Sequence, residues 1–264
     1  FSLKSMKANQ KIYLKNKFNK IKKLKNILNK LNKPRLRIDS EKIKRISHNT
    51  PIIIGGCARS GTTLLLEILG NHPNIFSIPI ETHVFCPTGY SENPNTNIPF
   101  NINKLNKIIT KYPTNYFCKR WCEKTPKNII FLKQILKHFN KKVKIINIIR
   151  DGRDVVLSIH PNSPLIYWVD PKRWVEDNYE GLKFKKDPNV LTIKYEDLIL
   201  DYNKTIKQIC NFINENPKPL LDLNIKLKKD SIGKWKKIEY NRRINELLNY
   251  PQAKALLNQL EYIS

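Results

Sequence analysis

Long hydrophobic runs are absent from this sequence of 264 residues. Its apolar stretches are only a few residues long, whereas a membrane-spanning helix needs about 20. A secretory signal is not recognisable either, because no charged start is followed by an apolar region and a small-residue cleavage site. We therefore expect no transmembrane segment in this chain.

Cysteine is scarce as well, with five residues in the whole sequence. They form no Cys-x-x-Cys pair and show no Cys/His spacing typical of zinc sites, so we expect no metal. The odd number argues against a complete disulfide framework. A single bridge, for example between Cys86 and Cys122, stays open for a chain in an oxidising compartment.

Acidic residues are too few to balance the basic ones. The 22 Asp and Glu residues stand against 49 Lys and Arg, which gives a formal net charge of +27 and an isoelectric point near 9.9. Such an excess fits an anionic partner, namely nucleic acid, a membrane surface, or an acidic polymer or cofactor. Lys and Asn also recur in segments with a structural pattern, so a general compositional bias is an equally good explanation.

The length suffices for one domain with an appendage. Residues 1–33 are rich in Lys and Asn and carry apolar residues at three- and four-residue steps, which predicts a basic amphipathic helix ending at Pro34. A charged linker to about residue 49 follows. We assign 1–49 as a basic helical N-terminal extension and 50–264 as the main domain. The helix fits a peripheral stalk better than a membrane-surface or partner-binding helix, and both stay open.

Beyond residue 50, strand patterns alternate with helical ones. Apolar β-branched runs predict strands at 52–54, 143–149 and 189–194. Helical spacing recurs at 64–69, 102–109, 129–139, 201–213 and 247–260, with a further helix starting near Val155. This alternation predicts an α/β, P-loop-like three-layer fold with a central parallel sheet flanked by helices. The Pro- and Asn-rich stretch 87–103 is typical of a loop, which we expect to cover a binding cleft.

A phosphate-site pattern follows the first predicted strand. After a Gly-Gly break, a helix is opened by Arg59, Ser60, Gly61, Thr62 and Thr63. The first amides of a helix have no intrahelical partner and carry partial positive charge, so anions bind there readily.

The spacing Gly56-x4-Gly61 matches the nucleotide P-loop only in part. Thr62 stands where that motif has the Lys that reaches the phosphates, which weakens an ATPase interpretation. Arg59 supplies positive charge from another position, as a planar fork able to hold a phosphate or sulfate with two hydrogen bonds.

A second candidate anion site follows the second predicted strand. Arg150 ends that strand, and Ser158 is expected two turns into the next helix. Because ligands of open parallel sheets bind beyond the carboxyl ends of the strands, a guanidinium and a hydroxyl could meet on one anion at this rim. The alternative is that Arg150 and Arg153 form surface ion pairs with their neighbouring aspartates and that Ser158 is an ordinary helix residue.

Together these residues resemble the PAPS-dependent sulfotransferases, over residues 51–262. The segment Arg59-Ser-Gly-Thr-Thr63 is similar to the 5′-phosphosulfate loop of that family, and the pair Arg150 and Ser158 resembles its 3′-phosphate site. The resemblance implies 3′-phosphoadenosine-5′-phosphosulfate (PAPS) as the donor, without a metal.

The tyrosylprotein and carbohydrate branch of that family is the nearest in its further motifs. Glu81-Thr-His83 resembles a Glu-Thr-Arg segment with the catalytic carboxylate, and Cys122-Glu-Lys124 resembles a Cys-Asn-Lys with a lysine at the transferring sulfate. The resemblance implies that Glu81 takes the acceptor proton and that Lys124 stabilises the sulfuryl group. His83 replaces the Arg and competes with Glu81 as the base.

Two later segments extend the resemblance. Tyr195, in a Tyr-Glu-x-Leu segment, is expected to reach the nucleotide, and the pair Ser231 and Lys234 belongs to a stretch similar to the late Gly-[Arg/Lys]-Trp element. The candidates for stacking on adenine are Trp121, Trp235 and Tyr195. We interpret Trp168 and Trp174 as packing residues.

The resemblance implies transfer of a sulfuryl group to a hydroxyl acceptor, a carbohydrate first and a protein tyrosine second, and the positive charge suits an acidic acceptor. Two other functions remain open. A P-loop kinase of a small molecule would bind Mg-ATP, and a basic nucleic-acid-binding protein would depend on residues 1–49. The Golgi lumen or its membrane and the cytoplasm all stay open as the location, as does the oligomeric state.

Overall fold

The computed structural model describes residues 39–88, 97–160 and 163–263. The chain divides into two units, Phe1–Ile38 and Asp39–Ser264. The helix predicted for 1–33 lies outside the described residues, as does part of the loop predicted at 87–103. All that follows concerns the second unit.

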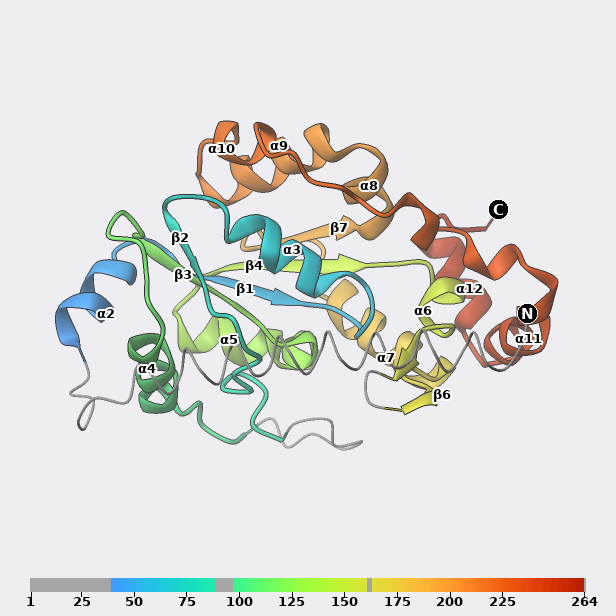
Figure 1. Cartoon of the computed structure of the whole chain (residues 1–264). Coiled ribbons are helices and arrows are strands. Elements are labelled where there is room, and N and C mark those ends of the chain that lie inside the picture. Colours follow the sequence, from blue (N-terminus) through green and yellow to red (C-terminus); the bar gives the residue numbers. More distant parts are fainter. Residues whose placement is uncertain (1–38, 89–96, 161–162, 264) are drawn as a thin grey trace. The chain divides into compact units, whose positions relative to one another are not determined.

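A five-stranded parallel sheet forms the centre of this unit (Figure 1). Its strand order is β2-β3-β1-β4-β7, and every neighbouring pair is parallel. The strands are β1 (Ile52–Gly55), β2 (Ile75–Ser77), β3 (Arg120–Lys124), β4 (Lys144–Ile149) and β7 (Val190–Lys194). The predicted α/β fold with a parallel sheet is therefore confirmed.

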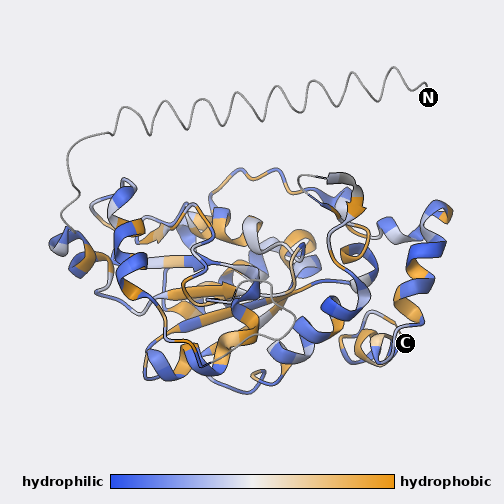
Figure 2. Cartoon of the chain, turned by 90° about the horizontal axis from the view of Figure 1, so that it is seen from below, coloured by the Kyte–Doolittle hydropathy of each residue, from blue (hydrophilic) through white to orange (hydrophobic). Residues whose placement is uncertain are grey.

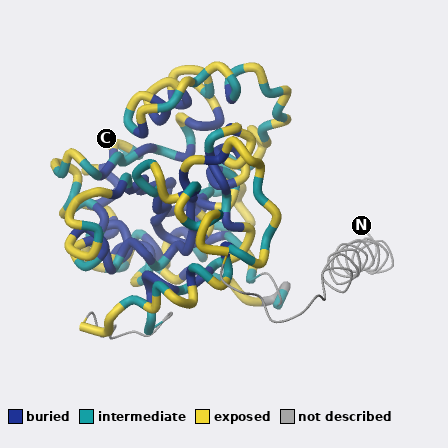
Figure 3. The backbone as a smooth tube through the Cα atoms, turned by 90° about the vertical axis from the view of Figure 1, so that its left-hand side faces the viewer, coloured by how far each residue is buried: buried dark blue, intermediate teal, exposed yellow. Residues whose placement is uncertain are grey.

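Alternating residues of the strands face opposite helical layers. Ile52 and Ile54 belong to a buried cluster with α3 (Thr62–Leu69) and α9 (Tyr202–Ile213), whereas Ile53 belongs to another with α5 (Leu132–His138). Helix α8 (Tyr195–Leu200) joins α9 on the first face. On the second face α5 is accompanied by the 3-10 helix η1 (Pro126–Phe131) and by α7 (Pro171–Leu182) (Figure 1). Figure 2 shows the strands as mainly hydrophobic, and Figure 3 shows that the buried segments lie inside this unit.

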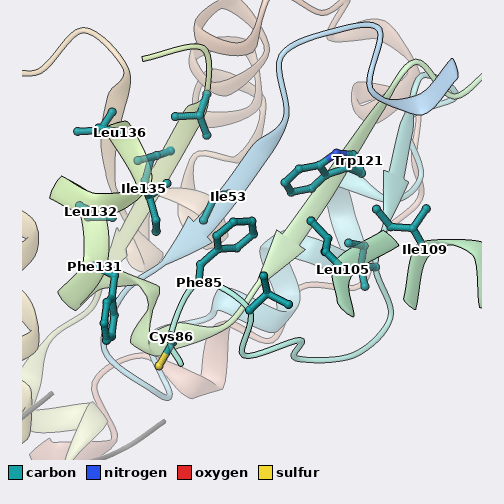
Figure 4. Close-up of a cluster of buried hydrophobic side chains, with 14 of the residues drawn as sticks. Ile53, Phe85, Cys86, Leu105, Ile109, Trp121, Phe131, Leu132, Ile135 and Leu136 are labelled. Carbon is teal, nitrogen blue, oxygen red and sulfur yellow. The ribbon is translucent and has the colours of Figure 1, made fainter. Parts of the chain in front are cut away.

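The second face carries a core that extends to the edge strand. Phe85 stacks on Trp121 with ring centroids 6.0 Å apart, beside α4 (Ile102–Lys111) and α5 (Figure 4). Ile46 of α2 (Ser40–Ile46) is fully buried in the same cluster. The stretch expected to be a linker therefore contains a helix that packs on the domain.

The chain around Ser158 differs from the prediction. Helix α6 (Gly152–Val155) has only four residues, and a turn follows it. The next residues, β5 (Ile159–His160), pair antiparallel with β6 (Ser163–Tyr167). The expectation that Ser158 lies two turns into a helix is wrong, because the helix ends at Val155 and the residues directly after Ser158 pair as a strand with β6.

The C-terminal part covers the ends of the strands beside α6 and α7. The closing helix predicted at 247–260 is two helices, α11 (Asn241–Leu248) and α12 (Ala253–Gln259), separated at Gln252 with a φ of 64°. Shorter elements precede them: α10 (Lys218–Leu221), η2 (Lys229–Ser231), η3 (Lys234–Lys236) and η4 (Ile238–Tyr240). Across the described ranges, we find no helix with the length and apolar character needed to cross a membrane.

Candidate functional site

A cavity of about 520 Å³ opens at the carboxyl ends of the central strands. Strand β1 lies between β3 and β4, so the connections leaving it diverge there, which is where open α/β sheets bind ligands. The residues lining the cavity come from the loop after β1 and the start of α3, from the segments after β2 and β3, from the ends of β4 and β7, and from the β5–β6 hairpin and the residue after it: Ala58, Arg59, Gly61, Thr62, Thr63, Leu64, Glu81, Pro126, Arg150, His160, Trp168 and Tyr195.

Two glycines give the loop after β1 its shape. Gly56 has a φ of 144°, and a Cβ there would lie 2.3 Å from the carbonyl oxygen of Ile148. Gly61 has a φ of 95°, and its Cβ would lie 2.4 Å from the ring of Tyr195. Neither position accepts a side chain, so the loop backbone passes close to β4 and to Tyr195.

The same loop leads directly into the N-terminus of α3. Gly61 is the N-cap residue and provides no side-chain cap, which leaves the first amides of the helix facing the cavity edge. The hydroxyl of Ser60 is fully buried and has no hydrogen-bond partner. Arg59, with a φ of 70°, is exposed. Free amides, an unsatisfied hydroxyl and a guanidinium together form a cradle for an anion.

Arg150 lies beside this cradle, as the sequence predicts. Its Nη1 donates to the carbonyl of Arg59 at 3.1 Å, and its guanidinium lies 4.4 Å from the centroid of the Tyr195 ring. Nη2 donates to the carbonyl of Ser231 at 2.5 Å, while the buried Nε has no partner. The positive charge is therefore held at the cavity, and the Nε–H donor is unused.

Ser231 contacts both Arg150 and Tyr195. Its Oγ donates to the carbonyl of Lys228, so the Tyr195 hydroxyl donates to Ser231 Oγ at 2.7 Å. Asp154 fixes the segment after Ser231, because its carboxylate accepts hydrogen bonds from the amides of Gly233 at 2.7 Å and Trp235 at 3.2 Å. Burial raises the pKa of Asp154, and these two hydrogen bonds act against the increase.

Four of the predicted donor-binding residues do not line the cavity that the described residues form. Ser60 and Ser231 adjoin residues of its wall, and the other two are Ser158 and Lys234. The Ser158 hydroxyl donates to the carbonyl of Asp154 at 3.4 Å, one turn back along its own chain. Lys234 is exposed on η3. In the described part of the chain, neither residue lines the cavity that Arg150 lines.

Glu81, His83 and Lys124 are brought together beside the loop. Lys124, at the end of β3, is 7% exposed and donates to Glu81 Oε1 at 2.6 Å. Glu81 is one-third exposed, and its Oε2 lies 3.9 Å from Nε2 of His83. A carboxylate able to accept a proton thus lies next to a cation, at the mouth of the anion cradle.

A second cavity, of about 590 Å³, adjoins the first. Thr63 and Glu81 line both cavities, and Lys124 lines the second. The other residues of its wall come from the outer side of α3 and from the segment after β2: Leu66, Glu67, Gly70, Asn71, Ser77, Pro79 and Ile80. Glu81 is therefore accessible from both cavities, and Lys124 from the second.

The aromatic residues are distributed differently from what the sequence suggests. Trp168 lines the first cavity, with its ring 4.2 Å from that of His160, whereas Trp174 is fully buried, as a packing residue should be. Among the residues considered for adenine, Tyr195 lines the cavity, Trp121 belongs to the core, and Trp235 stacks under the guanidinium of Arg153 at 3.7 Å.

Five residues of the cavity wall are not predicted from the sequence: Ala58, Leu64, Pro126, His160 and Trp168. Ala58 and Leu64 flank the Arg59–Thr63 motif and Pro126 lies two residues after Lys124, so proximity is the signal that points to them. His160 and Trp168 come together only through the β5–β6 pairing, for which the sequence has no clear signal.

Cysteines and metal ligands have no visible part in this site. All five cysteines are free and buried, including Cys86 and Cys122. Within 39–88, 97–160 and 163–263, no group of three or more His, Cys, Asp or Glu side chains is arranged to hold a metal ion.

Comparisons with known proteins all lead to one family. The sulfotransferase domain model matches residues 49–241. Human sulfotransferase 2A1 is 24% identical over 255 residues, which cover 82% of this chain and 76% of that protein.

Two solved structures share the fold. The sulfotransferase domain from the curacin biosynthetic pathway has a TM-score of 0.52 at 19% identity, covering 81% of this chain and 98% of its own. The sulfotransferase from Alicyclobacillus acidocaldarius has a TM-score of 0.50 at 14% identity, covering 75% and 94%.

Proposed function

The chain belongs to the sulfotransferase domain family, and from this premise we propose that it transfers a sulfuryl group from PAPS to a hydroxyl acceptor. The observation that carries the proposal is the Glu81–Lys124 pair, at 2.6 Å. Glu81 lines both cavities, of which the first contains the anion cradle, and Lys124 lines the second. A general base and a cation next to an anion site are what an in-line transfer to a hydroxyl requires.

The residues of the first cavity fit a sulfated adenosine bisphosphate. Ser60, with its unpartnered hydroxyl, and the amides of Thr62 and Thr63 would hold the 5′-phosphosulfate with Arg59. The unused Nε of Arg150 would serve the ribose phosphate, and the Tyr195 ring lies within the same cavity wall. When bound, the donor supplies a sulfuryl group joined to a phosphate, which is the leaving group.

The chemistry assigned to the chain is positioning and charge stabilisation. We assign Glu81 to accept the proton of the acceptor hydroxyl on a carboxylate oxygen, with His83 as the second candidate for that proton. Lys124 then provides positive charge for the sulfuryl oxygens and for the departing phosphate. The first amides of α3 supply further hydrogen-bond donors without having to reorganise.

We place the acceptor in the second cavity, because Glu81 and Lys124 both line it, whereas Arg150 and Tyr195 line the first cavity and not the second. An in-line displacement needs the acceptor and the leaving group on opposite sides of the sulfur, which two adjoining cavities satisfy. A carbohydrate hydroxyl is our first candidate and a tyrosine hydroxyl our second, and an acidic acceptor suits the net charge of +27.

Donor binding is tested by thermal unfolding with adenosine 3′,5′-bisphosphate and, separately, with Mg-ATP. A ligand at 100 times its dissociation constant stabilises the folded state by about 2.7 kcal/mol. For a chain of this size that corresponds to a shift on the order of 5–10 °C. We expect this shift with adenosine bisphosphate alone. A shift with Mg-ATP alone would favour the kinase instead.

Transfer is tested with labelled PAPS and a panel of sugars, peptides and alcohols. Glu81→Gln is expected to lower turnover by roughly 10²- to 10⁴-fold, the usual contribution of a general base, and to leave binding of adenosine bisphosphate unchanged. Glu176→Gln, an exposed carboxylate on α7, is the matched control. If Glu81→Gln turns over like the control, Glu81 is not the base.

A further inference from the structure

We propose that Glu123 is a positioning residue for sulfuryl transfer. Its carboxylate fixes the segment that carries Glu81 against the strand that carries Lys124. The role in sulfuryl transfer rests on the proposed function. The hydrogen bonds that hold the segment are tested without it, by amide hydrogen exchange.

Glu123 is fully buried at the fourth position of β3, next to Lys124. Its Oε1 accepts three hydrogen bonds, from the Thr82 amide at 3.2 Å, the Thr82 hydroxyl at 2.9 Å and the Thr125 hydroxyl at 2.6 Å. Its Oε2 accepts one from Nδ2 of Asn128 at 2.7 Å. Four donors therefore converge on one buried carboxylate.

Both hydroxyl groups have a defined direction. Thr82 Oγ1 accepts from the amide of Val84 at 3.2 Å, and Thr125 Oγ1 accepts from the amide of His83 at 3.4 Å. A hydroxyl has one proton, and in each case it points to Glu123. Two backbone amides of the Glu81 segment are thus connected to the carboxylate through two threonines.

The connections join three parts of the proposed site. Thr82 lies between Glu81 and His83, and Thr125 follows Lys124. Asn128 also donates to the carbonyl of Ile54, at the end of the strand that leads into the anion loop. Base, cation and anion loop are therefore linked through one side chain.

Stability alone does not explain a charge at this position. Burial raises the pKa of Glu123, and the hydrogen bonds from Thr125, Asn128 and Thr82 act against that increase. The same segment is already anchored by apolar burial, because Val84, Phe85 and Cys86 are almost fully inaccessible (Figure 4). Buried ionic groups seldom stabilise more than apolar ones of similar volume. Directional hydrogen bonds, unlike apolar contacts, fix orientation, and Glu81 needs a defined orientation toward Lys124.

The test compares Thr82→Val with Thr82→Ser. Valine keeps the shape of threonine but removes the hydroxyl, whereas serine keeps the hydroxyl. A misplacement of 1 Å can lower turnover by about 100-fold. We expect Thr82→Val to lower kcat at least about 10-fold, with the affinity for adenosine 3′,5′-bisphosphate unchanged, and Thr82→Ser to restore most of the rate. Thr205→Val, at a buried threonine of α9, is the control for the substitution itself.

Amide hydrogen exchange gives a readout that does not depend on transfer. We expect faster exchange of the His83 and Val84 amides in Thr82→Val and in Glu123→Gln, and no change there in Thr205→Val. Thr125→Val and Thr125→Ser repeat the comparison if Thr82→Val does not fold.

Two results would overturn the inference: unchanged exchange at these amides, or a Thr82→Val enzyme with the kcat of the unmodified chain. If the unmodified chain transfers nothing from PAPS although the exchange result is as expected, the proposed function fails and the positioning of this segment stands.

Discussion

Ser60 has a buried hydroxyl without a partner, in a loop whose other polar groups face a cavity. A buried unsatisfied polar group costs about 1–3 kcal/mol, and a natural fold keeps one when a ligand or water completes it. Ser60 therefore lowers the stability of the ligand-free fold, and its hydroxyl is a candidate for a hydrogen bond to the bound donor.

Ser60→Ala separates these two effects. We expect the ligand-free variant to unfold at the same or a slightly higher temperature, because a desolvation cost of about 1 kcal/mol is removed. Adenosine bisphosphate should bind more weakly, by roughly tenfold for the loss of one hydrogen bond to a charged group. Calorimetric titration and thermal unfolding measure the two quantities on the same sample. Lower stability together with unchanged affinity would show that the hydroxyl supports the loop and not the anion.

At the scale of the elements, the sequence predicts those whose pattern is local. Strands β1, β4 and β7 are apolar β-branched runs, and all three were predicted. Strand β3 was not, because Arg-Trp-Cys-Glu-Lys has no alternation, and its charged residues are buried by tertiary contacts such as those of Glu123.

The same distinction applies to the candidate site. The loop Arg59–Thr63 and the residue Arg150 were found because each follows a buried strand, which fixes its place at the sheet edge. The position of Ser158 depends on where α6 ends, and the contribution of Trp168 depends on a hairpin. Such boundaries depend on long-range pairing, which one sequence does not reveal.

Helix α3 has two functions in the proposed mechanism, because its N-terminus faces the donor cavity and its outer side lines the acceptor cavity. Asn71, just after the helix, lines the second cavity but not the first, and is exposed. Asn71→Trp should therefore raise the KM for the acceptor, because the indole occupies space in this cavity. The affinity for adenosine bisphosphate should stay unchanged.

Initial rates over a range of acceptor concentrations test this prediction, with Asn103→Trp on the exposed side of α4 as the control. If both variants have the acceptor KM of the unmodified chain, the acceptor does not use the second cavity. A change in donor affinity alone would show that the two cavities hold a single ligand.

In the molecule as a whole, net charge and buried carboxyl groups have opposite effects on the stability of the fold in mild acid. The 49 Lys and Arg residues outnumber 22 acidic ones, so protonation of carboxylates increases self-repulsion and destabilises the fold. Three partly or fully buried carboxyl groups act in the other direction. Burial raises the pKa of Glu123, Asp154 and Glu196, so the folded state binds their protons more tightly than the unfolded state does.

Glu196 is the best of the three for an experiment, because it lies outside the proposed Glu81–Lys124 pair and a glutamine fits there. Its carboxylate accepts from the amide of Asp151 at 3.1 Å and from the Tyr262 hydroxyl at 2.7 Å. A glutamine can keep the first bond through its oxygen, and its NH₂ group can donate to the Tyr262 oxygen instead. The substitution therefore removes the titration with little change in the contacts.

The sign of the effect follows from the raised pKa. Stability that comes from protonating Glu196 is fully present below its ordinary pKa of 4.5 and is lost as the pH rises through the higher folded-state value. In about 0.5 M salt, where the Debye length is only about 4 Å, self-repulsion is largely screened. The free energy of unfolding, measured in urea, should then fall between pH 5 and pH 7 in the unmodified chain. It should fall by less in Glu196→Gln. At low salt, self-repulsion would obscure this difference in slope. Equal slopes in the two proteins would mean that Glu196 titrates alike in the folded and unfolded states, and that its burial is compensated by Tyr262 and Asp151.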